Sequence, residues 1–151
     1  MDQLRELYKY DFHIRNLAHA LRYVNERKLA EFGLTSPQAR LLGAIDDGRR
    51  VLETGVNRKY LEETTLLKGP SITSLLNGLE KSGFIRRSPN AHDARNTDIE
   101  ITAKGNGLLG ELRRFFIETE SLMLQGMTEV EKEIFLHLLE KAGTNLSKKR
   151  G

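Results

Sequence analysis

The spacing of apolar residues changes from helical to alternating at Gly83, and this change constrains the fold more than any other feature of the chain. Before it, apolar residues recur every three or four positions over residues 70–82, which predicts a helix. After it, residues 84–88 and 97–101 alternate in the manner of strands. Because residues 89–96 between them are polar and rich in turn formers, we expect a hairpin directly behind the helix.

A capping box marks the start of an earlier helix. Thr35 and Gln38 have the spacing at which each side chain caps the other's backbone N–H, and the helical pattern continues to about Asp46. The glycine and charged residues at 47–50 predict the end of this helix. Residues 51–53 then predict a short strand.

Another short helix follows. Asn57 can cap a helix over residues 58–66, and Gly69 with Pro70 cannot continue that helix. Proline is nevertheless well placed in the first turn of the next helix. Two helices joined by a short turn and followed by a hairpin make a winged helix-turn-helix. The fold class is therefore mainly α, with a small β-hairpin wing.

Long amphipathic helices flank this central part. Residues 1–32 predict one helix whose apolar stripe is wider than one docking face needs, which favours packing between two subunits. An ordinary core helix in a monomer is the alternative. Thr102 can cap a helix over residues 103–126, and Thr128 begins a second capping box and the last helix.

The formal net charge of +3 is small, but it is concentrated in the centre of the chain. Residues 1–48 and 105–151 each hold seven basic and seven acidic side chains, whereas residues 49–104 hold ten and seven. A local excess of positive charge predicts a polyanionic partner.

Several classes of protein are excluded or disfavoured. The chain has no cysteine, so disulfides, thiolate metal sites and thiol redox switches are ruled out. The sequence has no run of about 18–20 apolar residues and begins with a charged segment, so we expect a soluble, cytoplasmic protein. No metal or cofactor is expected, because the histidines lack paired ligand spacing: His13, His19, His92 and His137.

An enzyme is not expected. Residues 104–107 superficially suggest a phosphate loop, but they lack the required glycine pattern and the Lys-Ser/Thr pair. The positive central part favours a protein that binds a polyanion. The alternative function that stays open is a helical protein-interaction dimer without specific DNA binding.

Five segments, in the right order and spacing, resemble the MarR family of bacterial transcriptional regulators. The resemblance covers essentially the whole chain and implies a single domain over residues 1–151, with a helical dimerisation layer at 1–34 and 103–151 and a winged helix part at 35–102. It also implies a homodimer on a pseudo-palindromic operator, usually a repressor that small ligands release. The segments are Leu34-Thr35-Ser36-Pro37-Gln38, Ser71-Ile72-Thr73, Leu79-Glu80-Lys81-Ser82-Gly83-Phe84-Ile85, Asp93-Ala94-Arg95 and Ile101-Thr102-Ala103-Lys104-Gly105.

The sequence departs from the family pattern in three places. The connection from Ile45 to Leu61 is several residues longer than usual, and Lys68 stands where a serine N-cap is frequent. Ser74 and Ala94 stand where many members carry arginine. These departures concern base reading and not the fold.

A recognition helix over about 70–82 would enter the major groove, and a wing over about 86–97 would reach the minor groove. Asn77 can pair bidentately with adenine, and no arginine lies on this helix face for guanine. We therefore expect modest direct readout and an A/T-leaning operator; a solvated helix surface is the alternative. The candidate DNA contacts are Lys68, Pro70, Ser71, Thr73, Ser74, Asn77, Arg86, Arg87, Asp93 and Arg95.

Arg95 is the sharpest of these candidates. A cation at a hairpin tip can enter a narrow minor groove, where the negative potential is enhanced. Asp93 can hold the guanidinium through a charged hydrogen bond; alternatively, the pair only stiffens the wing. Five further basic side chains could contact phosphates, or could be solvated surface charges. They are Arg86, Arg87, Lys68, Lys81 and Arg58.

The resemblance also implies a small aromatic or lipophilic effector between the dimer layer and the winged helix. Asp11 and Arg15 interrupt the apolar stripe one turn apart, which fits such a site or an intrahelical salt pair. The candidate lining residues are Tyr8, Phe12, His13, Arg15, Arg40, Phe115 and Phe116.

Overall fold

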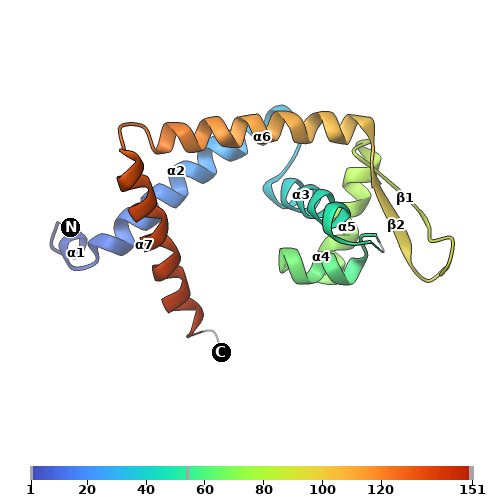
Figure 1. Ribbon diagram of the computed structural model, residues 1–151, viewed down its shortest axis with the longest axis horizontal. Helices are drawn as coiled ribbons and strands as arrows, with labels where there is room; N and C mark the ends of the chain where they lie inside the picture. The colour runs from blue at the N-terminus through green and yellow to red at the C-terminus, as the bar shows by residue number, and fades with distance from the viewer. Residues whose placement is uncertain (1, 54, 150–151) are drawn as a thin grey trace. The chain divides into compact units, whose positions relative to one another are not determined.

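The structure is a computed structural model that describes residues 2–53 and 55–149 (Figure 1). It forms two compact units, Met1–Glu111 and Leu112–Gly151, with the boundary inside one long helix. The elements in chain order are α1 (Asp2–Leu7), α2 (Lys9–Glu31), α3 (Ser36–Val51), α4 (Arg58–Thr65), α5 (Gly69–Lys81), β1 (Ile85–Pro89), β2 (Thr97–Ile101), α6 (Ala103–Met123) and α7 (Glu129–Ser147).

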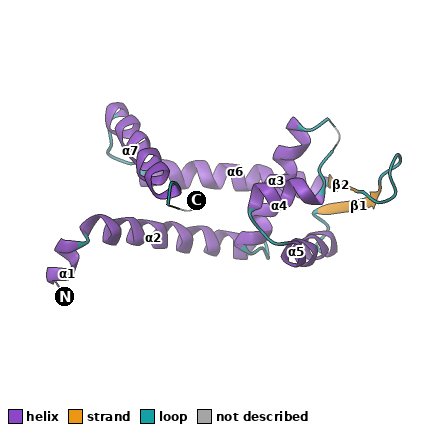
Figure 2. Ribbon diagram, turned by 90° about the horizontal axis from the view of Figure 1, so that it is seen from below, coloured by secondary structure: helices purple, strands orange, loops and turns teal. Residues whose placement is uncertain are grey.

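The first unit has its core where α3, α4 and α5 meet. α3 contacts both α4 and α5, and α5 contacts β1. Figures 1 and 2 show the three helices clustered, with the two-stranded hairpin beside them. This arrangement confirms the predicted winged helix-turn-helix. The largest fully buried side chains are Leu41, Leu42, Ile45, Leu61, Ile72, Leu79 and Ile85.

The hairpin is antiparallel and in the predicted place. Ile85 pairs with Ile101 and Arg87 with Ile99, so the three isoleucines are buried on one face. α5 ends just before Gly83, which takes φ +81°, a left-handed conformation that favours glycine. The change of period at this glycine therefore marks the junction of helix and wing.

The N-terminal helix is not continuous, which corrects the prediction of one helix over residues 1–32. It is interrupted at Tyr8, whose φ of −121° and ψ of 37° are not helical. The Tyr8 side chain makes no capping hydrogen bond, although its carbonyl accepts the N–H of Phe12 at 2.9 Å. The sequence has neither glycine nor proline here, so no local signal indicates the interruption. Met1 lies outside the described residues.

The predicted end of a helix at 47–50 and the strand at 51–53 are both wrong. α3 continues to Val51, and the N–H of Leu52 still donates to the carbonyl of Gly48 at 2.9 Å. Gly48 is required by packing, because a Cβ there would lie 2.6 Å from Tyr60 Cε1 and 2.7 Å from Val56 Cγ2. The glycine thus allows α3 to pack closely on its neighbours, and it does not end the helix.

The predicted caps are confirmed. Both capping boxes form, at Thr35 and Thr128, and the Asn57 side chain accepts the N–H of Tyr60 at 2.9 Å. Thr102 accepts the N–H of Gly105 at 3.1 Å. Within the part of the chain that is described, no helix has the length and apolarity needed to cross a membrane.

Candidate nucleic-acid interface

α5 has one buried apolar face and one exposed polar face. Ile72, Leu76 and Leu79 are buried in the core of the first unit. Because helical side chains three and four positions apart share a face, the polar residues between them fall together on the other side. The exposed side chains there are Pro70, Ser71, Ser74, Asn77 and Lys81. Lys68 occupies the N-cap position without a side-chain capping bond.

Thr73 is placed differently from the other predicted base contacts. It is half-buried, and its hydroxyl donates to the carbonyl of Gly69 at 3.1 Å. The same hydroxyl accepts a hydrogen bond from the Arg58 guanidinium on α4. Because a threonine hydroxyl has a single donor, the one in Thr73 is already used within the protein.

Arg87 on β1 is held by two residues of α5. Its Nε lies 3.2 Å from Glu80 Oε2 and its Nη2 3.3 Å from Glu80 Oε1, and its backbone N–H also donates to Glu80 Oε2 at 3.0 Å. Nη2 further donates to Asn77 Oδ1 at 2.6 Å. The positive charge of the Arg87 guanidinium is therefore neutralised by Glu80, and its orientation is fixed. An arginine that is available to a DNA phosphate would lack such a partner in the protein. Arg86, the neighbouring residue on β1, forms a different ion pair, in which its Nη2 lies 3.0 Å from Glu100 Oε2 on β2.

The pH dependence of stability should report the Glu80–Arg87 contact. The hydrogen bond from the Arg87 side chain is the main cause that lowers the pKa of Glu80 below its ordinary value of 4.5, against an opposing effect of burial. A carboxyl group whose pKa is lowered by folding stabilises the protein above its ordinary pKa, and this contribution is lost as pH falls through the folded-state pKa.

We therefore expect the wild-type protein to lose more unfolding free energy than Glu80→Gln between about pH 5 and pH 3. Urea unfolding of both proteins at each pH measures the difference. Parallel pH profiles for the two proteins would contradict the prediction.

Asp93 shapes the loop of the wing, which corrects its predicted role. Its carboxylate accepts the backbone N–H of Arg95 at 3.0 Å and the side-chain amide of Asn96 at 3.1 Å, and it does not hold the guanidinium. The reason is geometric, because an aspartate two residues before an N–H readily closes an Asx turn. In the described part of the chain, the exposed Arg95 guanidinium has no hydrogen-bond or ion-pair partner.

Asn90 is a structural residue of the wing that sequence reasoning missed. Its Oδ1 accepts the N–H groups of His92 and Asp93 at 2.8 and 2.9 Å, and its Nδ2 donates to Asp98 Oδ1 at 2.8 Å. The turn preference of asparagine was the available signal. Together, Asn90 and Asp93 order the loop that carries Arg95.

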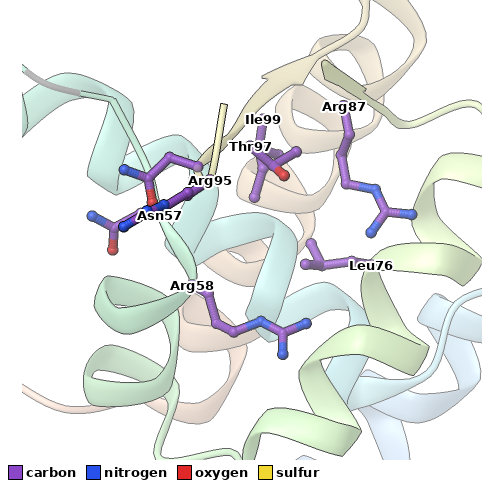
Figure 3. Close-up of a pocket in the computed structure, with 8 residues that line it drawn as sticks. Asn57, Arg58, Leu76, Arg87, Arg95, Thr97 and Ile99 are labelled. Atoms are coloured by element: carbon purple, nitrogen blue, oxygen red, sulfur yellow. The ribbon is translucent and has the colours of Figure 1, made fainter. Parts of the chain in front are cut away.

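A pocket of about 440 Å³ lies between α4, α5 and the hairpin. Figure 3 shows around it the side chains of Arg58, Arg87 and Arg95, which come from three different elements. None of the lining residues is acidic, although Arg87 is paired with Glu80 of α5. The lining residues are Asn57, Arg58, Leu76, Arg87, Arg95, Asn96, Thr97 and Ile99.

The residues predicted to line an effector site belong to both units. Phe115 and Phe116 lie in the second unit, and the other five lie in the first. Arg15 Nε is 2.8 Å from Asp11 Oδ2, so the intrahelical salt pair accounts for the polar interruption of α2. Among the described residues, no group of three or more His, Asp or Glu side chains is arranged to hold a metal ion.

A helix-turn-helix with an exposed polar face, followed by a two-stranded hairpin, defines a winged helix protein. A family model described as the MarR family matches residues 32–96. A solved structure of a putative MarR family transcriptional regulator from Clostridium acetobutylicum is 33% identical, with a TM-score of 0.69, and the match covers 91% of this chain and 98% of that one. The chain belongs to the MarR family, whose members are transcriptional regulators and not enzymes.

Two further similarities concern regulators that are more distant or longer. The S. aureus MepR–DNA complex is similar with 26% identity and a TM-score of 0.74, covering 91% of this chain and 97% of that one. The transcriptional regulator TtmR of Methylorubrum extorquens is 36% identical over 103 residues, which are 67% of this chain and 49% of TtmR. The chain thus spans about half the length of this curated relative.

Proposed function

We propose that this regulator binds a specific duplex DNA site as a homodimer, with α5 in the major groove and the wing in the minor groove. The observation that carries the proposal is the Arg95 guanidinium, which has no partner among the described residues and lies on a loop ordered by Asp93 and Asn90. Beside it, α5 presents a small polar face that a major groove can accommodate. The similarity to the S. aureus MepR–DNA complex supports the same use of the fold.

The dimer is supported by apolar side chains that remain exposed on the helices of both units. These side chains recur at helical spacing and form stripes, which mark interfaces when they are contiguous. Residues 1–34 and 103–151 would then form the dimerisation layer around the winged helix part, 35–102. The exposed side chains include Leu17, Leu21 and Val24 on α2, and Ile134 and Leu138 on α7. Sedimentation equilibrium should give about twice the 17.2 kDa mass of one chain.

Salt dependence of binding tests whether the partner is duplex DNA. Lys68, Lys81 and Arg58 can neutralise phosphates, and each neutralised phosphate contributes a slope of about −0.9 to the plot of log affinity against log salt. Three such contacts from each subunit, six in the homodimer, predict that affinity falls roughly a thousandfold between about 50 and 200 mM salt. Fluorescence anisotropy with a labelled duplex measures this, and binding to a specific site must also survive unlabelled competitor DNA.

The competing function is a helical protein-interaction dimer without specific DNA binding. That protein would show weak anisotropy changes, equal for all duplexes and abolished by competitor. Repression and release by a small aromatic or lipophilic ligand stay predictions of the family resemblance. A ligand-dependent rise in the melting temperature of the dimer, with salicylate-like compounds as probes, is the measurement that bears on the effector.

A further inference from the structure

The polar side chains of α5 do not all remain available to a partner. The Thr73 hydroxyl is used by Gly69 and Arg58, and the Asn77 carbonyl oxygen is used by Arg87. In the described part of the chain, the groups without a hydrogen-bond partner on this face are the hydroxyls of Ser71 and Ser74, the amide nitrogen of Asn77 and the ammonium of Lys81.

The orientation of the Asn77 amide is determined by its neighbour. A guanidinium has only donors, so the Asn77 atom that faces Arg87 must be the oxygen. Glu80 fixes Arg87 in turn, through both carboxylate oxygens and the backbone N–H of Arg87. The amide nitrogen, with its two N–H donors, is therefore the group that Asn77 presents outward.

We propose that Arg87 is a positioning residue that makes Asn77 a donor-only reader of the major groove, selecting guanine or thymine at one position of each half-site. This inference rests on the proposed function. In the major groove guanine presents two acceptors, N7 and O6, and thymine presents the acceptor O4. Cytosine presents only the N4 donor, and adenine presents its N7 acceptor beside the N6 donor, which opposes the second N–H of Asn77. The bidentate adenine contact predicted for Asn77 from sequence is therefore not expected. That contact needs Asn77 Oδ1 to accept a hydrogen bond from adenine, which would break its hydrogen bond with Arg87.

The first test uses a preferred duplex obtained by selection, with each base pair of a half-site replaced in turn. The wild-type protein should prefer guanine or thymine over adenine or cytosine at one symmetry-related pair of positions, on the order of three- to tenfold. Asn77→Ala should lose that preference there and nowhere else. A wild-type preference for adenine at the position sensitive to Asn77→Ala would overturn the inference.

Two variants separate positioning by Arg87 from other roles. Asn77→Asp changes an exposed residue and replaces the donors with acceptors, so the preference at that position should invert toward cytosine or adenine. The paired variant Glu80→Gln with Arg87→Met removes the guanidinium without leaving an unpaired carboxylate, so the freed amide should now favour adenine. Arg49→Met, at an exposed arginine outside the proposed contacts, is the matched control for loss of charge.

The alternatives give different results. If Arg87 contacts a phosphate, the paired variant will bind all sequences more weakly, with a shallower salt slope and unchanged base preference, and the inference fails. If the wild-type protein selects no sequence at all, the proposed function itself fails, and the inference fails with it. Positioning by Arg87 is supported if the paired variant changes base preference at one position only and still unfolds cooperatively.

Discussion

Replacing Arg95 with alanine should weaken binding to a preferred duplex by about tenfold to a hundredfold, which corresponds to roughly 1.4–2.8 kcal/mol. The guanidinium is exposed, has no partner in the described part of the chain, and lies on a loop that Asp93 and Asn90 order through backbone hydrogen bonds. Little conformational entropy of the loop is therefore lost on binding, and the charge is free to enter a narrow minor groove.

The matched control for Arg95 is Arg49→Ala, which removes the same charge from the end of α3. We expect that control to change the affinity less than threefold, measured by anisotropy at fixed salt. This is about the effect of removing one surface charge that salt screens. Arg95→Ala affinity within twofold of wild type would show that the wing does not contact DNA and that Asp93 only stiffens the loop.

Gly105→Ala should destabilise the protein by about 2–3 kcal/mol, because it overpacks the junction between the wing and α6. A Cβ at residue 105 would clash with the carbonyl oxygen of Phe84 and lie 2.7 Å from Ile101 Cγ2. That carbonyl also accepts the N–H of Thr102 at 3.1 Å, so the backbone there cannot move freely.

Gly107 provides the control in the same helix. A Cβ at that position meets no atom within 4 Å, so Gly107→Ala should gain about 0.5–1 kcal/mol from helix propensity alone. Urea unfolding at one protein concentration compares the variants, since the stability of the proposed dimer would depend on concentration. Equal stability of the two alanine variants would contradict the close packing assigned to Gly105.

The local features of the fold were predictable from sequence. Capping boxes at Thr35 and Thr128, the cap at Asn57 and the stop at Gly83 each depend on residues within a few positions, and all four form. The hairpin was also predictable, because two segments of alternating apolar side chains joined by a polar loop indicate one.

Features that depend on contacts between elements were not predictable. Gly48 carries the sequence signal of a helix end, yet its role is set by Tyr60 and Val56 packed against it. The interruption at Tyr8 has no local signal at all. At the candidate site, sequence reasoning found Asn77 and Arg87 but treated them as independent, because nothing in the sequence joins residues from a helix and a strand.

Selection of bound sequences from a random duplex pool, with the full chain, tests the proposed binding mode most directly. A homodimer should enrich a pseudo-palindrome with half-site centres one helical turn apart, about 10–10.5 base pairs, or a multiple of that spacing. Enrichment of no sequence, or of a single half-site without its inverted copy, would contradict a homodimer that reads DNA through α5 and the wing.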